Sequence, residues 1–581
     1  MNRLRSSTRR SRRAAPALFA LGAAVACGGD REGRTSTADR APSGAAGDAS
    51  AVGATGGTVV VATAGDAESL LPPLAVGVTA RQVTDLLFEP LAELGEELNT
   101  IGDAGFRPRL ARAWTWAPDS LSIAFALDPR ARWHDGVPVG AEDVRFTFAL
   151  HRDTTFAAPS ADDVAGVDSV TVRDARTPVF WFSRRSPEQF YAAAARLRIL
   201  PAHLLARIPV ADLRASTFTR RPVGSGRFRF AGWDPQRRIE VVADSAHPQG
   251  RARLDRVVWT VAPDPAAALA LLLSGAADVF EGVRPEHLAA VGRRSELTTV
   301  RYPGLQYGFL VFNLHGGATG AGGPLFADRA LRRALAQALD RPAMVRNVFD
   351  TLATVPAGPL TRAQALVDTA ERQLPLDAGA ARRTLDSLGW RPGPDGVRTR
   401  GGRPLAFTIS VPRSSETRAR FAVLIQEQLR NVGVAARVEP LEFGAFMERI
   451  GRRRFDAAIG AWNLDNPSPW GVQQLWGGAA ARAPGGPNLA GYASLAFDAA
   501  IDSARGATGE SEARRLLARA VQRINDDAPA VWLFEPRPLL AVHRRLRVRG
   551  VRADAWWAGL ADWTIDPART IARDGTARST R

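Results

Sequence analysis

Two short motifs in the first half of the chain contain side chains that could do acid–base or nucleophilic chemistry. The His-Asp-Gly triplet at 134–136 places an imidazole beside a carboxylate. Asp-Gly is also a strong signal for a tight turn between strands, so we predict a structural turn. The Gly-Ser-Gly triplet at 224–226 resembles half of a nucleophile elbow, but elbow glycines lie two residues to either side of the serine. We therefore predict a second turn.

The sequence lacks the residues that several other catalytic mechanisms require. The seven histidines are scattered and form no His-Glu-x-x-His motif, so we expect neither a metal site nor a cofactor. The sequence contains no lysine, and all 76 basic residues are arginine. This excludes a Walker A lysine, a Schiff-base lysine and a Ser-x-x-Lys nucleophile. We predict no catalytic residues and a protein that is not an enzyme.

A net charge of +17 and an isoelectric point near 11.2 raise the possibility of nucleic-acid binding. The arginines are interleaved with 59 acidic residues, however, which is the pattern of a mixed solvated surface. Six of the arginines also precede Cys27. The sequence therefore predicts no nucleic-acid partner.

The N-terminus has the pattern of an export signal. Residues 1–13 are basic, residues 14–26 are small and apolar, and Cys27 follows. The sequence before Cys27 resembles a bacterial lipobox, with Ala24 where leucine is usual, so we predict a signal peptide with a lipobox over 1–27. The alternative is an ordinary cleaved signal with an incidental cysteine. Residues 28–56 are rich in Gly, Ala, Ser and Thr, which predicts a flexible tether.

The first half of the remaining chain alternates strands and helices. Residues 58–62 are apolar and β-branched, which predicts a buried strand, and 254–262 predict another. Asp264 and Pro265 are an N-cap and a first-turn proline, so a helix should follow and end at Gly275. A further strand over 278–280 would complete a βαβ unit.

The second half repeats this pattern. Strands are expected over 407–411, 434–438 and 455–461. The first intervening helix should begin near Ser415, and the second should be lined by its apolar residues Phe443, Phe446, Met447 and Ile450. Strands separated by helices imply parallel pairing with right-handed crossovers. Ligands of open α/β sheets bind beyond the carboxyl ends of strands, which is where Trp462 is expected.

Several segments resemble one family in the same order along the chain. Residues 110–150 contain a Trp, an Asp-Ser pair, a Trp-His-Asp-Gly turn and a Glu-Asp-Val helix start. Further matches lie at 222–228, 272–278, 326–341 and 380–390. Together they resemble the extracellular solute-binding proteins of family 5, which include the oligopeptide-, dipeptide- and nickel-binding proteins of ABC importers. Trp133 stands where the family usually has Phe.

The resemblance implies an α/β fold of the type II periplasmic-binding class, with two lobes joined by a hinge. Lobe I would comprise 57–303 and 528–581, with an inserted subdomain near 96–219. Lobe II would comprise 304–527. The chain would first cross between the lobes near 302–313.

The resemblance also nominates ligand-binding residues. In peptide-binding relatives, a Trp-x-x-Asp at the end of this strand places the carboxylate against the α-ammonium of the ligand, and here the matching residues are Trp462 and Asp465. A water-poor cleft can hold an ammonium only beside an opposite charge, and an indole ring offers a π face to a cation. We add Asn463 and Tyr307 as candidates. Alternatively, Asp465 caps a turn, and Trp462 and Tyr307 are core residues.

The predicted function is a substrate-binding lipoprotein of an ABC importer, which captures peptides between its lobes and delivers them to permease subunits. It would be a monomer, exported to the periplasm or the exterior of the cell envelope and held at a membrane by the lipid on Cys27. One alternative is the same fold binding a nickel complex, an oligosaccharide or an amine-bearing small molecule. Others are a sensory lipoprotein that does not transport and an exported hydrolase.

Overall fold

The computed structural model describes residues 56–575 apart from 317–323, 369–372, 484 and 508. The predicted signal peptide, Cys27 and almost all of the predicted tether lie outside the described residues. The largest sheet has seven strands, in the order β12 (Leu297–Arg301), β22 (Leu539–His543), β11 (Val279–Val283), β1 (Thr58–Thr63), β10 (Arg256–Val261), β9 (Arg238–Ala243) and β8 (Phe228–Asp234). The central strand β1 is parallel to both of its neighbours, and the other pairs are antiparallel.

The predicted βαβ unit is present in this sheet. It consists of β10, helix α5 (Pro265–Leu273) and β11, with β1 lying between the two strands. The carboxylate of Asp264 accepts a hydrogen bond from the backbone N–H of Ala267 at 2.8 Å, which caps the helix. Gly275 follows the helix with a φ of +77°, a conformation in which glycine has no steric penalty.

A four-stranded antiparallel sheet is inserted between β1 and β8. Its order is β4 (Ala111–Trp116), β5 (Ser122–Leu127), β7 (Thr177–Trp181) and β6 (Ser169–Asp174). Its buried residues Phe125 and Phe180 belong to the same apolar cluster as Val61 and Trp259 of the large sheet. The inserted segment therefore shares its core with the seven-stranded sheet. The elements around it are α1 (Val78–Leu87), β2 (Ala92–Leu94), β3 (Phe106–Pro108), α2 (Ala141–Arg152), α3 (Gln189–Ala194) and α4 (Ala202–Leu205).

The second large sheet has six strands. Their order is β14 (Ala353–Thr354), β21 (Ala530–Pro536), β13 (Gln306–Phe312), β20 (Ala457–Asn463), β18 (Ala406–Pro412) and β19 (Ala435–Leu441). The predicted strands at 407–411, 434–438 and 455–461 correspond to β18, β19 and β20. As predicted, β18 is parallel to β19 and β20, whereas β13 runs antiparallel to β20 and β21.

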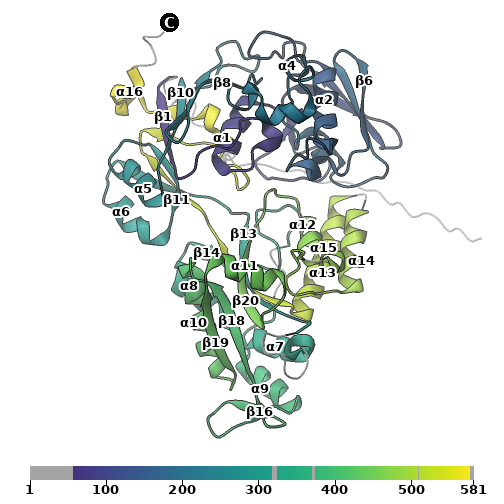
Figure 1. The fold of residues 1–581 in the computed structure, drawn as a ribbon, viewed down its shortest axis with the longest axis vertical. Helices are drawn as coiled ribbons and strands as arrows, with labels where there is room; N and C mark the ends of the chain where they lie inside the picture. Colours follow the sequence, from purple (N-terminus) through teal and green to yellow (C-terminus); the bar gives the residue numbers. More distant parts are fainter. Residues whose placement is uncertain (1–55, 317–323, 369–372, 484, 508, 576–581) are drawn as a thin grey trace, which may run out of the picture. The chain divides into compact units, whose positions relative to one another are not determined.

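Helices cover both faces of the six-stranded sheet. Alternate residues of a strand point to opposite faces, and in β13 Leu310 and Phe312 join one apolar cluster while Phe309 and Val311 join another. The first cluster includes residues of α7 (Arg329–Gln337), α8 (Arg341–Phe349), α9 (Ala378–Ser387) and α10 (Glu416–Arg430). The second includes residues of α11 (Phe443–Gly451), α12 (Gly471–Trp476), α14 (Leu495–Arg505) and α15 (Glu510–Asp527). Figure 1 shows α10 beside β18 and β19.

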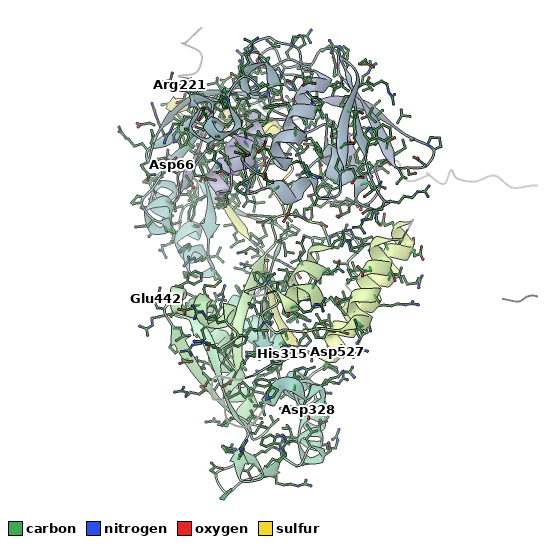
Figure 2. All side chains as sticks on the ribbon, turned by 45° about the vertical axis from the view of Figure 1, so that its right-hand side comes forward. Asp66, Arg221, His315, Asp328, Glu442 and Asp527 are labelled. Atoms are coloured by element: carbon green, nitrogen blue, oxygen red, sulfur yellow. The ribbon has the colours of Figure 1, made fainter. Side chains whose placement is uncertain are left out.

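Local capping signals set the starts of these helices. Ser415 caps α10, as predicted, by accepting a hydrogen bond from the N–H of Arg418. Asp328, labelled in Figure 2, caps α7 in the same way by accepting from the N–H of Ala330 at 2.8 Å. Within the described ranges, no helix combines the length and the apolar composition that a membrane span requires.

The chain passes between the two large sheets twice, and the two crossings touch. The first runs from β12 to β13 and the second from β21 to β22. The backbone N–H of Tyr302 donates to the carbonyl of Pro538 at 3.2 Å. A Cβ at Gly304 would lie 2.8 Å from the carbonyl oxygen of Pro536, so glycine allows this close approach. Because β21 pairs within the six-stranded sheet, we place the second crossing after Pro536 rather than at 528. The division into lobe I and lobe II remains a proposal.

A buried ionic network ties the end of the chain to its first described strand. Arg545 is completely buried, and its guanidinium donates to Asp278 at 2.7 Å and to Asp574 at 2.8 Å. It also donates to the backbone carbonyl of Thr58 at 2.8 Å. The carboxylate of Asp278 in turn accepts from the N–H of Val60 at 2.9 Å. Residues from four distant parts of the sequence thus meet at one guanidinium.

Candidate functional site

The two motifs that could have done chemistry contact each other. The N–H of Gly224 donates to Nδ1 of His134 at 3.1 Å, and Nε2 of His134 lies 2.9 Å from the carbonyl oxygen of Gly226. Burial lowers the pKa of His134, which favours the neutral ring that these two contacts require. Ser225 is 2 % exposed, and its hydroxyl accepts from the N–H of Glu89 at 3.3 Å. The predicted turns are therefore joined by the imidazole, which has a structural role.

Replacing Gly224 with alanine should strongly destabilise the first lobe. A Cβ at this position would lie 1.9 Å from the carbonyl oxygen of Leu87, so the backbone must shift. Overpacking of this kind costs about 1–3 kcal/mol and more where backbone is involved. Urea unfolding followed by tryptophan fluorescence should show the loss. The control is Gly232→Ala, because a Cβ there has no neighbour within 4 Å. Equal stabilities for the two variants would contradict the tight packing of this turn.

Three of the predicted binding residues lie at the end of β20 or just beyond it. Asn463 is exposed and accepts a hydrogen bond from the side chain of Gln306 at 2.5 Å. Trp462 is partly buried, and its ring centroid lies 6.2 Å from that of Phe309. Asp465 is two residues beyond the strand, and its side chain is 85 % exposed. The water-poor setting expected for this carboxylate is therefore not what the structure shows.

Asp465 nevertheless faces a residue on a helix of the first lobe. Its Oδ1 lies 3.8 Å from Nη1 of Arg81 on α1. The Arg81 side chain is 39 % exposed, and an ion pair with this geometry contributes at most about 1 kcal/mol. The contact is thus weak, but it places a cation and an anion from two lobes at the same point.

A second carboxylate lies near Arg81. Glu281, in the middle of β11, accepts from the side chain of Gln82 at 2.9 Å and from the indole of Trp556 at 2.5 Å. Burial raises its pKa above the ordinary glutamate value, while the nearby charge of Arg81 opposes this shift. Strand β11 of one large sheet and the segment after β20 of the other therefore each contribute a carboxylate to the surroundings of Arg81.

Tyr307 lies in the core. It is completely buried, and its hydroxyl accepts a hydrogen bond from the indole N–H of Trp476 at 3.0 Å. Its ring also packs edge-on against Trp532 with a centroid distance of 6.1 Å. The structure matches the alternative interpretation for this residue, so we leave Tyr307 out of the site that we propose.

Some N–H donors around this region have no hydrogen-bond partner. Among the described residues, Nε of Arg81 and the indole N–H groups of Trp462 and Trp470 are buried without an acceptor. Buried polar groups in native proteins almost always have a partner, which can be protein, water or ligand. These three donors belong to α1 and to the segment that carries Asp465, so a ligand there would find donors for its carbonyl groups.

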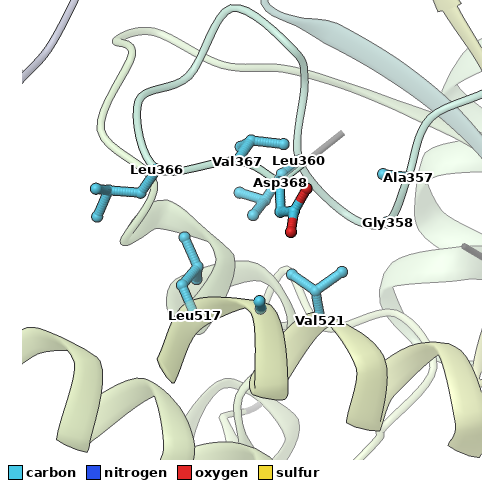
Figure 3. A pocket seen from close by; sticks show the side chains of 9 residues that line it. Ala357, Gly358, Leu360, Leu366, Val367, Asp368, Leu517 and Val521 are labelled. Atoms are coloured by element: carbon cyan, nitrogen blue, oxygen red, sulfur yellow. The ribbon is translucent and has the colours of Figure 1, made fainter. Parts of the chain in front are cut away.

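Two hollows elsewhere in the fold do not coincide with these residues. The cavity in Figure 3 is lined by Leu360, Val367, Leu517 and their neighbours, and its volume of about 10 Å³ fits no more than a single water. A larger hollow of about 580 Å³ is lined by Glu68, Arg214 and Arg220, among others. Its arginines are already engaged, because Arg214 donates to the carbonyl of Phe156 and Arg220 stacks on Trp233 at 4.9 Å.

The described residues gather no group of three or more His, Cys, Asp or Glu side chains that could hold a metal ion. Sequence reasoning missed two residues of the site, Arg81 and Glu281. Glu281 directly follows the predicted strand 278–280, and ligands of α/β sheets bind beyond strand ends, so it could have been nominated, although the structure extends the strand to Val283. Nothing in the sequence distinguishes Arg81 from the other arginines.

The comparisons with known proteins agree with this architecture. The family model of the bacterial extracellular solute-binding proteins, family 5 Middle, matches residues 105–483. The oligopeptide-binding protein AppA of Bacillus subtilis is 24% identical over 499 residues, which cover 84% of this chain and 88% of AppA.

Solved structures show the same fold. AppA of Bacillus subtilis in complex with a nonapeptide gives a TM-score of 0.69 at 23% identity, over 88% of this chain and 99% of that one. NikZ of Campylobacter jejuni in complex with Ni(L-His) gives 0.71 at 21% identity, over 87% and 99%. These similarities confirm the predicted two-lobed α/β fold.

Proposed function

The chain belongs to the bacterial extracellular solute-binding proteins of family 5, and from that membership we propose that it captures peptides between its lobes and delivers them to the permease of an ABC importer. The single observation that carries this proposal is the pair of Arg81 and Asp465, which brings helix α1 of the first lobe to the segment that follows β20 in the second. The name of AppA and its complex with a nonapeptide support the choice of peptides.

Binding would begin with an exchange of cations at Asp465. The guanidinium of Arg81 is held by a weak, exposed ion pair, which the α-ammonium of a peptide can replace at little cost. The displaced Arg81 and the unpartnered indole N–H of Trp462 would then be free to donate to carbonyl groups of the peptide. A ligand that contacts both lobes favours their closed arrangement by its differential affinity for that arrangement.

Native mass spectrometry of the protein purified from its own host tests the ligand class. We expect added masses that disappear on denaturation and that fragment as peptides. A bound mass that carries nickel or fragments as a sugar would show that the ligand is not a peptide. Nickel complexes and sugars are alternatives that the same fold could bind. Titration with a synthetic nonapeptide and with its N-acetylated form then shows whether a free ammonium is required.

We also propose that the protein is exported and held at a membrane by a lipid on Cys27. The basic and apolar segments before Cys27 support this proposal. In its native host, the wild-type protein should partition into the detergent phase after phase separation, whereas Cys27→Ser should partition into the aqueous phase. Ser50→Ala serves as the control, because it leaves the lipid acceptor intact. Detergent partitioning of both variants would exclude Cys27 as the anchor.

A further inference from the structure

A short loop of the first lobe docks onto the second lobe, at a place distinct from the chain crossings. The loop comprises residues 98–102 and follows β2. Its residue Ile101 is buried in an apolar cluster whose other buried members, among the described residues, all lie between Tyr307 and Trp532. The loop therefore contributes a side chain to the core of the other lobe.

Polar contacts flank this apolar one. The amide of Asn99 donates to Glu510 of α15 at 3.2 Å. Thr100 is completely buried, and its hydroxyl donates to the carboxylate of Glu188. The other oxygen of Glu188 accepts from the hydroxyl of Ser468 at 2.8 Å. Glu188 thus joins the loop to the segment that carries Asp465.

The loop and Glu188 form one unit within the first lobe. The N–H of Gly102 donates to the carbonyl of Pro187 at 2.9 Å, which fixes the loop beside Glu188. On the other side, the carbonyl of Ser468 accepts from the side chain of Gln364 at 2.8 Å, which fixes the segment within the second lobe. The hydrogen bond between Glu188 and Ser468 is therefore a link between two internally anchored parts.

We propose that residues 98–102 and Glu188 act as a clasp that holds the two lobes together, and that protonation of Glu188 controls its strength. Opening of the lobes would withdraw Ile101 from its apolar cluster and break the bond between Glu188 and Ser468. Ser468, to which the clasp binds, lies three residues from Asp465 in the same segment, so engagement of the clasp also positions the carboxylate of the proposed ligand site.

The burial of Glu188 sets the direction of this control. Burial raises its pKa to about 7, even though the hydroxyls of Thr100 and Ser468 and the charges of Arg196 and Arg505 act in the opposite direction. Tyr191 also faces it from α3, and the more distant Glu510 is engaged by Asn99. When the lobes separate, water reaches Glu188 and its pKa falls toward the ordinary 4.5. Because the clasped state has the higher pKa, its stability is greatest below the ordinary value and is lost as the pH rises through 7.

Pulsed electron paramagnetic resonance on the peptide-free protein tests the clasp. Cys27→Ser removes the native thiol, and Val172→Cys and Leu495→Cys place spin labels on exposed positions of the two lobes. Short distances between the two labels report closed lobes and long distances report open lobes. The ratio of closed to open protein should fall roughly tenfold or more from pH 5.5 to pH 8.5, since each unit of pKa difference between the two states can change their ratio tenfold.

Variants separate the clasp from other effects of pH. Glu188→Gln should stay closed at both pH values, because the amide is neutral. Ile101→Ala and Ser468→Ala should lower the closed fraction at pH 5.5, and Ser468→Thr, which keeps the hydroxyl, should restore it. An unchanged wild-type ratio, or a Glu188→Gln variant that responds to pH as the wild type does, would overturn the proposal. Thermal unfolding of each variant shows that the lobes remain folded. No peptide is present, so the outcome is independent of the proposed function.

Discussion

Replacing Asp465 with asparagine is expected to weaken the binding of a nonapeptide with a free N-terminus by about 10- to 150-fold. Hydrogen bonds to charged groups contribute about 1.5–3 kcal/mol, and 1.4 kcal/mol is a factor of ten in affinity. The exposed Asp465 carboxylate is available to an incoming ammonium, because among the described residues only the weak contact with Arg81 competes for it. Isothermal titration calorimetry measures the change directly.

Two controls give this result its meaning. Asp526→Asn changes a partly exposed aspartate of the same lobe, paired with Arg333 at 3.1 Å, and should leave affinity unchanged. The N-acetylated nonapeptide lacks the ammonium, so wild type and Asp465→Asn should bind it equally weakly. If Asp465→Asn binds the free peptide as tightly as the wild type does, the role of this carboxylate is refuted. Peptide binding itself would then depend on other residues.

Replacing Arg545 with methionine should lower the free energy of unfolding of the first lobe by about 3–5 kcal/mol. Removing one partner of a buried ion pair leaves the other charge without compensation in a poorly solvated place. Asp278 is completely buried, and although Arg573 also contacts it, Asp574 would lose its guanidinium donor at Arg545, and so would the carbonyl of Thr58. Methionine fills a similar volume, so the loss of stability would come from the disrupted charge network rather than from a cavity.

A neighbouring residue supplies the matched control for this variant. Arg547 lies two positions away on β23 (Leu546–Arg547), and its ion pair with Asp566, at 3.7 Å, is partly exposed. Arg547→Met should cost about 0–1 kcal/mol. Urea unfolding and limited proteolysis of the C-terminal segment should both rank Arg545→Met as the more damaged protein. Similar losses in the two variants would show that the buried network does not stabilise the lobe.

Local signals predicted much of the fold. Asp264 and Gly275 bracket α5, and Ser415 starts α10, because capping and left-handed glycine conformations depend on residues close in sequence. The apolar stripe of α11 was only partly informative. Phe446 and Ile450 are buried, but Phe443 and Met447 are 49 % and 47 % exposed. The sequence of a helix does not show how much of its apolar stripe the neighbouring elements cover.

The candidate site depends on long-range contacts, which limits what the sequence can predict. Tyr307 lies on a strand that is buried on both faces, so alternation along β13 does not distinguish a core position from a ligand-facing one. Arg81 and Asp465 are far apart in the sequence and meet only through the tertiary contact between α1 and the segment after β20. The resemblance to a family named Trp462 and Asp465, and physical reasoning from the structure added Arg81 and Glu281.

The strand order of the seven-stranded sheet also determines when this protein can finish folding during synthesis. Strand β22 lies between β11 and β12, yet the ribosome makes it more than two hundred residues after both. Until then, the nascent chain has no strand to join those two, and Asp278 lacks the guanidinium of Arg545. A strand that is translated after every strand of the second large sheet therefore completes the first.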